Sequence, residues 1–449
     1  MPIMNWLTAS VRILTMGPVT PSRPAPQHSG GPRVAGPRPT APVGDLQKRI
    51  EAPTPEARSV RRVDEGDRSS PDTMLHTTVR PWLRAELRIP MVTYGVVSLD
   101  EDLANLSICR FEANGHCAID PTQKKWSPKR LLTHPQGDAL LDSVVARVQQ
   151  FLDSTGTGID ALVLCVPGTI RDDEVIARST RLGITTETKV ADVLTSRLHV
   201  PVTVCRDVDC LALGEIYGSG DPAFANVEWC AESLAYVLVN EGIGMSLMFD
   251  GIVYHGAGSA GALGRMIVEP HGGFNATFAS RGSLENYASR PGISSNIVAE
   301  YMAELDRSGG TLQASPAVVR QIEAAIASNQ PRSLDVTAIA SCADDDDELL
   351  RKVFRESATY MGMALSGIIA TLNPPLIVLG GTLIESSKAY ADLIQAYTRM
   401  FAYGAAWRRT SMLVATCGDK SHILGSALWA ERRFGNLGQT WTPGKGLLL

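Results

Sequence analysis

The sequence has no apolar run near the roughly 18 residues that cross a bilayer, so it predicts no membrane-spanning helix. It also has no basic excess. The net charge of -5 gives no general attraction to nucleic acid or to anionic lipid. Its 8 cysteines include no Cys-x-x-Cys pair, and several, such as Cys165, stand in apolar strand-like runs. We therefore predict reduced core cysteines in a cytoplasmic protein with no membrane partner.

Large apolar side chains are scarce in the first 90 residues, which hold 14 of the 27 prolines. Residues 21–42 are rich in Pro, Gly, Ser and Arg and cannot bury enough apolar surface to fold. Residues 1–44 contain arginines and no acid, as transit peptides do, but the prolines argue against an amphipathic helix. We predict a Pro-rich disordered extension over residues 1–90. The alternative is that translation starts at Met74 or Met91.

From Met91 onward the hydrophobic pattern is regular and indicates an α/β fold of alternating strands and helices. The acidic residues 344–348 predict a solvated helix N-terminus, with a metal site as the alternative. Pro374 and Pro375 end the last long helix. Strands are expected at 92–99, 106–111, 161–166, 202–205, 234–239, 245–249 and 376–379. Helices are expected at 139–152, 190–198 and 358–372.

Six short motifs follow one another along the chain: Val166-Pro167-Gly168, Arg206-Asp207 before Leu213-Gly214-Glu215, Gly242-Ile243-Gly244, Gly264-Arg265, Arg281-Gly282-Ser283-Leu284-Glu285, and Asn373-Pro374 before Gly380-Gly381. In this order they resemble the ROK family (repressor, open reading frame, kinase) of bacterial sugar kinases and sugar-responsive repressors. The resemblance implies a two-lobed actin-like or hexokinase-like (ribonuclease H-like) ATPase fold with an interlobe cleft. We expect an N-terminal α/β lobe at 91–210, completed by a helix at 422–436, and a C-terminal α/β lobe at 211–421.

The resemblance assigns roles to residues on both sides of this cleft. Asp207 matches the catalytic base that takes a proton from the sugar hydroxyl as it attacks the γ-phosphate. Gly242 and Gly244 match the second phosphate loop, where glycines let backbone amides approach phosphate oxygens. Gly380 and Gly381 match the adenosine-contacting turn. The alternatives are a helix N-cap for the aspartate, and ordinary turns for the glycines, with positive φ in the hairpin.

Changes in the phosphate loops point away from catalysis. The family's Asp-x-Gly-Gly-Thr loop is replaced by the acidic segment 100–105, and repressor-type members lose this loop as well. Glu241 stands beside the second loop. Two like charges 4 Å apart repel by roughly 4 kcal/mol at an effective dielectric of about 20, so a triphosphate is disfavoured there unless a cation intervenes. ATP and Mg²⁺ therefore stay open as cofactors.

The expected sugar site is also altered. Glu285 matches a sugar-contacting glutamate, and it is predicted to bind substrate with Arg206 and Arg265. The family has Asn at the position of Arg206 and a zinc-binding His at the position of Arg265. Arg265 is expected either to pair with Glu285 or to bind an anionic ligand bidentately.

No metal site is predicted. The family's zinc cysteines align with Ala276, Phe278 and Ser283, none of which ligates zinc. The histidines at positions 199, 255, 271 and 422 show no ligand spacing and are interpreted as surface or hydrogen-bonded residues. A structural zinc is therefore not expected.

Three functions are compatible with these residues. The first is a catalytically impaired carbohydrate sensor or transcriptional regulator, which binds a sugar-like ligand in the cleft. The second is an ATP-dependent hexose or amino-sugar kinase that uses Asp207 as its base, and the third is a pseudokinase scaffold. Repressor members carry a helix-turn-helix domain, but prolines interrupt residues 46–89, so DNA stays open as a partner. The resemblance also implies a homo-oligomer.

Overall fold

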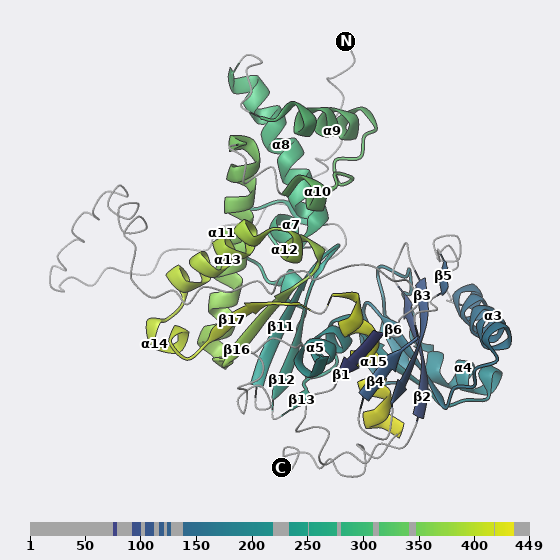
Figure 1. The fold of residues 1–449 in the computed structure, drawn as a ribbon. Helices are drawn as coiled ribbons and strands as arrows, with labels where there is room; N and C mark the ends of the chain where they lie inside the picture. Colours follow the sequence, from purple (N-terminus) through teal and green to yellow (C-terminus); the bar gives the residue numbers. More distant parts are fainter. Residues whose placement is uncertain are drawn as a thin grey trace, which may run out of the picture. The chain divides into compact units, whose positions relative to one another are not determined.

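Two sheets organise the part of the chain that the computed structural model describes, and all of it belongs to one compact unit, Ser70–Leu449 (Figure 1). The described residues are 75–78, 92–99, 104–111, 116–120, 124–126, 138–218, 233–249, 251–275, 280–308, 314–340, 347–416 and 418–434.

The first sheet has the strand order β1-β4-β3-β2-β6-β10, with β5 paired to β3. Strands β2, β6 and β10 run parallel, whereas β3 pairs antiparallel with β2. The fully apolar sequence of β6 fits a strand that is buried on both faces. The strands are β1 (Leu75–Thr78), β2 (Val92–Leu99), β3 (Ala104–Phe111), β4 (His116–Ile119), β5 (Lys124–Trp126), β6 (Ala161–Val166) and β10 (Val202–Arg206).

The second sheet has the order β13-β12-β11-β16-β17, in which β11, β16 and β17 are parallel and β12 is antiparallel to β11. Its strands are β11 (Ser233–Val239), β12 (Ile243–Phe249), β13 (Ile252–Val253), β16 (Leu376–Gly380) and β17 (Ser411–Val414). Two small sheets contain β7 (Thr169–Arg171), β8 (Val175–Arg178), β9 (Thr188–Lys189), β14 (Phe274–Asn275) and β15 (Ser280–Arg281).

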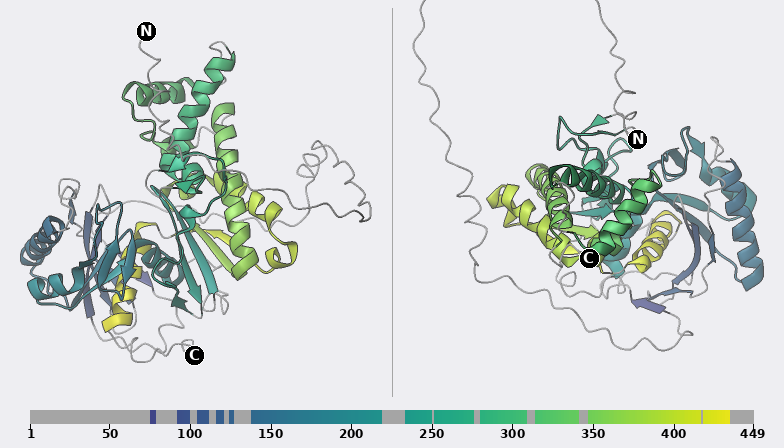
Figure 2. Two further views of the ribbon diagram at one scale, coloured as in Figure 1. Left: turned by 180° about the vertical axis from the view of Figure 1, so that it is seen from behind. Right: turned by 90° about the horizontal axis from the view of Figure 1, so that it is seen from above.

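Helices cover the sheets in three apolar clusters. Helices α3 (Asp138–Thr155) and α4 (Val190–Leu198) pack on one face of the first sheet. Helices α5 (Asp207–Gly218) and α15 (Asp419–Phe434) share a cluster with residues of both sheets, and Figure 2 shows them between the sheets. The far face of the second sheet is covered mainly by α8 (Arg290–Ser308), α11 (Glu348–Leu372) and α13 (Lys388–Phe401).

Shorter helical segments complete the second half. They are η2 (Leu263–Arg265), α7 (Glu285–Ala288), α9 (Pro316–Ala327), α10 (Val336–Ala340), α12 (Thr382–Ser386) and α14 (Gly404–Trp407). Among the described residues, no helix combines the length and the apolar character that crossing a bilayer would need.

Close packing of α5 on α15 depends on two glycines. A Cβ atom added to Gly214 would lie 1.7 Å from the carbonyl oxygen of Ser421, and one added to Gly425 would lie 1.7 Å from that of Cys210. Any side chain at either position would force the helices apart. The C-terminal helix therefore packs against the helix that begins at Asp207.

Three sequence-based expectations differ from the structure. Cys109 and Cys117 form a disulfide, so the prediction of reduced cysteines is wrong for this pair. The antiparallel pairing of β3 with β4 brings the two residues, which are 8 apart in the sequence, to a Cα–Cα distance of 6.5 Å. Strand β1 lies inside the stretch expected to be a disordered extension, where it pairs with β4. Asp347 is a buried N-cap of α11 rather than a solvated acid, and it accepts a hydrogen bond from the Leu350 amide at 3.0 Å. Residues 344–346 lie outside the described residues.

Candidate functional site

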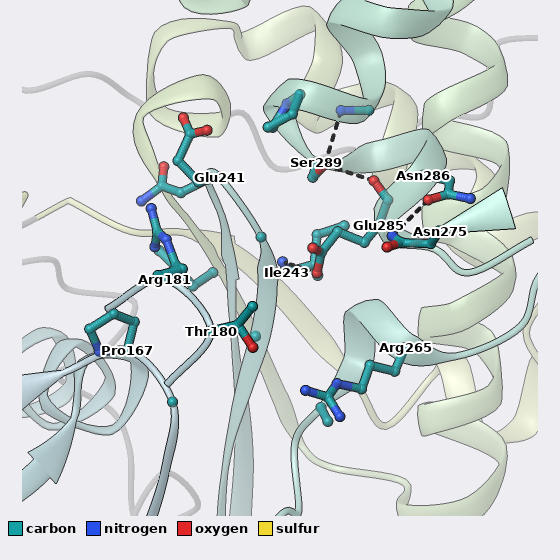
Figure 3. A pocket seen from close by; sticks show the side chains of 18 of the residues that line it. Pro167, Thr180, Arg181, Glu241, Ile243, Arg265, Asn275, Glu285, Asn286 and Ser289 are labelled. Carbon is teal, nitrogen blue, oxygen red and sulfur yellow. Dashed lines mark hydrogen bonds between the residues drawn. The ribbon is translucent and has the colours of Figure 1, made fainter. Parts of the chain in front are cut away.

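One cavity of about 590 Å³ brings together the C-terminal end of β10, the turn between β11 and β12, η2 and α7 (Figure 3). Most of the predicted site residues line it. These are Arg206, Asp207, Gly242, Gly244, Arg265 and Glu285. Their place in one cavity follows from strand order, since β10 and β11 end at the same region of the unit.

Arg206 and Asp207 line the cavity, and together with the fully buried Asp209, which does not line it, we call them the cavity floor. Asp207 is the first residue of α5, and its Oδ1 atom accepts a hydrogen bond from the Val208 amide at 2.8 Å. A carboxylate at this end of a helix is favoured by the helix dipole. Asp207 therefore stands at the start of a helix, as the alternative interpretation expected, and it also lines the cavity.

Arg206 also lines the cavity, but its guanidinium forms hydrogen bonds within the protein. Its Nε and Nη2 atoms bind the two carboxylate oxygens of Asp209 at 2.6 and 2.7 Å, and its Nη1 atom binds the Ala260 carbonyl at 2.7 Å. His255 Nε2 lies 2.9 Å from the same carboxylate. Burial alone would raise the pKa of Asp209, but the hydrogen bonds from His255 and Arg206 outweigh it and lower this pKa. This geometry gives Arg206 a structural role.

We call Glu241, Gly242, Ile243 and Glu285 the cavity wall. Neither Gly242 nor Gly244 has a positive φ, so the turn does not need glycine for its backbone conformation. A Cβ atom at Gly242 would instead lie 3.3 Å from Glu285 Oε2, and the same oxygen accepts a hydrogen bond from the Ile243 amide at 3.4 Å. Because Gly242 has no side chain, there is room beside it for the Glu285 carboxylate.

Glu241 forms an ion pair with Arg290, whose Nε lies 2.8 Å from Glu241 Oε1. Arg290 is therefore the cation beside Glu241, which the sequence alone did not identify. The turn is still flanked by two carboxylates, and one of its amides already donates to Glu285. This arrangement does not fit the polyphosphate of ATP with Mg²⁺.

Arginines surround Glu285 from several elements. Arg181, Arg265 and Arg332 line the cavity and act electrostatically on this carboxylate. Burial raises the pKa of Glu285, although the Ile243 amide and these arginines oppose the shift. Figure 3 shows Arg181 and Arg265 coming from different elements, with the Arg265 guanidinium pointing away from the Glu285 carboxylate.

Gly380 and Gly381 do not line this cavity. A Cβ atom at Gly380 would lie 2.1 Å from the Tyr236 hydroxyl oxygen, and one at Gly381 would lie 2.2 Å from the Val239 carbonyl oxygen. Gly381 also has a φ of 110°. Packing and backbone conformation explain why both positions hold glycine, and the adenosine-contacting role stays a prediction.

The family's zinc position does not fit a metal in the described residues. Arg265 stands at the histidine position, and Ser283 is a fully buried serine at a cysteine position. Ala276 and Phe278 lie outside the described residues, as do residues 100–103 of the expected first phosphate loop.

Sequence reasoning missed three arginines of the cavity, Arg178, Arg181 and Arg332. Arg178 and Arg181 follow the Pro167-Gly168 strand end within the small sheet, and Arg332 precedes α10. For Arg178 and Arg181 the only available signal was that they follow the Val166-Pro167-Gly168 motif in the sequence. Arg332 had no such signal, because its approach to Glu285 depends on tertiary packing.

The two-sheet fold and this cavity define a protein of the actin-like or hexokinase-like class. The ROK family model matches residues 116–433, so the chain belongs to the ROK family. It is 26% identical to a glucokinase of Halalkalibacterium halodurans over 308 residues, which cover 68% of this chain and 84% of that protein.

Two solved structures share this fold. One is a ROK family transcriptional regulator described as a homolog of the E. coli MLC protein, with a TM-score of 0.61 and 17% identity over 75% of this chain and 77% of that chain. The other is a ROK family glucokinase from Streptomyces griseus in complex with glucose and AMPPNP, with a TM-score of 0.57 and 19% identity over 76% of this chain and 99% of that chain. The family thus includes kinases and regulators with one fold.

Proposed function

We propose that this protein is a carbohydrate-sensing or regulatory member of the ROK family, with impaired phosphoryl transfer. The observation that supports this most directly is the cavity wall, where Glu241 and Glu285 flank the glycine turn and Glu285 accepts the Ile243 amide. A sugar-like ligand would occupy the cavity. Its binding would be transmitted by lobe closure or by a change of homo-oligomeric state.

The charge of the lining favours a carbohydrate that carries an acidic group. Among the described lining residues, Asp207, Glu241 and Glu285 are outnumbered by arginines. Arginine binds carboxylate and phosphate groups through two parallel hydrogen bonds. Apart from Arg206, whose guanidinium is bound to Asp209, the lining arginines are Arg178, Arg181, Arg265 and Arg332. We therefore expect a hexuronate or a sugar phosphate to bind more tightly than the matching neutral hexose.

A thermal-shift series without ATP tests this ligand class. Glucose, glucuronate and glucose 6-phosphate differ in charge on one ring. A ligand at 100 times its dissociation constant adds about 2.7 kcal/mol of stability. We expect the acidic sugars to raise the melting temperature more than glucose, and Arg265→Ala to reduce that difference. Equal shifts for the neutral and the acidic sugars would contradict the preference, and no shift with any carbohydrate would favour a pseudokinase scaffold.

An ATP-dependent sugar kinase is the second candidate, because Asp207 lines the same cavity as the glycine turn. The test is ADP production by the purified chain with a panel of hexoses and amino sugars. We expect no turnover above background. Turnover that is lost in Asp207→Asn but kept in Glu285→Gln would establish the kinase instead.

A further inference from the structure

A cluster of three cysteines adjoins the cavity floor. Cys165 comes from β6, Cys205 from β10 and Cys210 from α5, and their Sγ atoms all lie within 4.8 Å of one another. All three are buried, with exposed fractions of 0–1%, and none lines the cavity. The parallel register places Cys165 directly beside Cys205, so the strands hold two of the sulfur atoms on one face.

A histidine of α15 adjoins the cluster at Cys165, and its ring would move closer to the other two sulfur atoms to complete a four-ligand set. His422 of α15 places its Nε2 atom 3.0 Å from the Cys165 sulfur. Its Nδ1 atom lies 2.7 Å from the hydroxyl oxygen of Ser98 in β2. Histidines that bind metals usually have one ring nitrogen held by such a partner while the other faces the ion. Ser98 therefore acts as a positioning residue for His422.

We propose that Cys165, Cys205, Cys210 and His422 form a zinc site. Zinc in structural sites prefers four tetrahedral ligands, and three thiolates with one imidazole are among its usual sets. Zn–S and Zn–N bonds of about 2.3 and 2.0 Å imply S···S separations near 3.8 Å and N···S separations near 3.5 Å. The Cys205 and Cys210 sulfur atoms, 2.7 Å apart, need to separate by about 1 Å to reach this geometry.

The sulfur atoms of Cys205 and Cys210 are in direct contact, 2.7 Å apart. A disulfide between these two residues would leave Cys165 and the oriented His422 unexplained. A zinc ion uses all four side chains.

The position of the proposed zinc site indicates a structural role. Its ligands come from β6, β10, α5 and α15, and Asp207 starts the helix that carries Cys210. With four protein ligands no coordination position is left for water, so the zinc would hold structure and would not activate a nucleophile. It would fix the start of α5, and hence Asp207, on the first sheet.

The first test is the metal content of the full chain, purified under reducing conditions without chelator and then incubated with Zn²⁺ and desalted. We expect about one zinc per chain by elemental mass spectrometry. Replacing zinc by Co²⁺ should give a sulfur-to-cobalt charge-transfer band and the intense visible bands of tetrahedral cobalt. This measurement needs no variant, so it stands even where substitutions lower stability.

Substitutions then assign the ligands. Cys205→Ser and Cys165→Ser should lose the zinc and weaken the charge-transfer band. Ser98→Ala keeps all four ligands and should weaken zinc binding about 10- to 100-fold. Cys342→Ser, a thiol beyond the described residues, is the matched control and should keep the metal.

Several results would overturn the site. One is the absence of zinc and of a thiolate–cobalt band in the folded wild-type chain. Another is unchanged zinc content in Cys205→Ser. A third is a Cys205–Cys210 disulfide, found by peptide mapping of the reduced-purified protein with no bound metal.

Discussion

The cavity floor and the cavity wall both carry charges, but they balance them differently. On the floor, Arg206 and Asp209 are buried and bind each other bidentately. On the wall, Glu241 pairs with a half-exposed Arg290, and Glu285 is balanced by arginines that line open space. The floor is thus complete without a ligand. The wall leaves cationic groups facing the cavity, where an acidic carbohydrate would meet them.

The comparison distinguishes residues that stabilise the fold from residues that determine which ligand binds. Buried ion pairs cost much when one partner is removed, whereas exposed ones cost little. Substitutions of the buried pair Arg206 and Asp209 should therefore affect stability first. Substitutions on the wall should affect binding first.

The largest effect is expected from Asp209→Ala on the floor. The change leaves the Arg206 guanidinium buried without its carboxylate, so we expect a loss of about 3–5 kcal/mol of unfolding free energy. Because the pKa of Asp209 is lowered from 3.8, its stabilisation is full above that pH and disappears as the pH falls through the folded-state pKa. Urea denaturation across this range measures it. Asp207→Asn is the control and should cost little, since asparagine also caps helices.

A smaller effect should come from Gly381→Ala, outside the cavity. Alanine is strained at a φ of 110°, and its Cβ atom would meet the Val239 carbonyl. We expect a loss of about 1–3 kcal/mol, with unchanged affinity for the carbohydrate. Gly242→Ala on the wall is the counterpart: it should shift Glu285 and alter affinity at little cost in stability. Equal losses of stability in Gly381→Ala and Gly242→Ala would contradict this difference, because the cavity wall would then contribute to the fold as much as the turn at Gly381 does.

The pH dependence of Glu285 sharpens the comparison further. Its pKa is raised from 4.5, so the folded chain holds the proton more tightly than the unfolded chain. Wild-type stability should therefore fall as the pH rises from about 4.5 through the folded-state pKa. Glu285→Gln lacks this loss and should gain in relative stability over that window. Thermal unfolding of both proteins at several pH values measures the difference, and parallel curves would contradict it.

The smallest effect is expected from Arg290→Ala. The Arg290–Glu241 pair is 35% and 37% exposed, so its removal should cost only about 0.2–1 kcal/mol. The unpaired Glu241 should weaken binding of acidic sugars more than binding of glucose. A titration of both sugars by calorimetry, with Lys388→Ala as a surface control, tests this.

Much of the fold was predictable because the sheets bury continuous apolar strands. The strand at 161–166 and the helix at 190–198 match the structure, and 202–205 and 376–379 differ from it by one residue. These elements depend on local patterns. The Cys109–Cys117 disulfide does not, since it requires the pairing of β3 with β4. The lobe boundaries stay a prediction.

The site was predictable only where a motif marked it. Asp207, Gly242 and Glu285 were found through motif order, and the structure brings them to one cavity. Arg290, Arg181 and Arg332 reach Glu241 and Glu285 from distant segments, so no spacing reveals them. His422 shows no ligand spacing for the same reason, because α15 returns to β6 only in the folded chain.

The close contact of α5 with α15 has a consequence for biosynthesis. Gly214 is translated about two hundred residues before Gly425, yet each helix needs the other's glycine to reach its place. A nascent chain still attached to the ribosome therefore lacks the cover for one face of its first sheet until the last helix emerges. That apolar face is open to chaperones throughout synthesis of the second half.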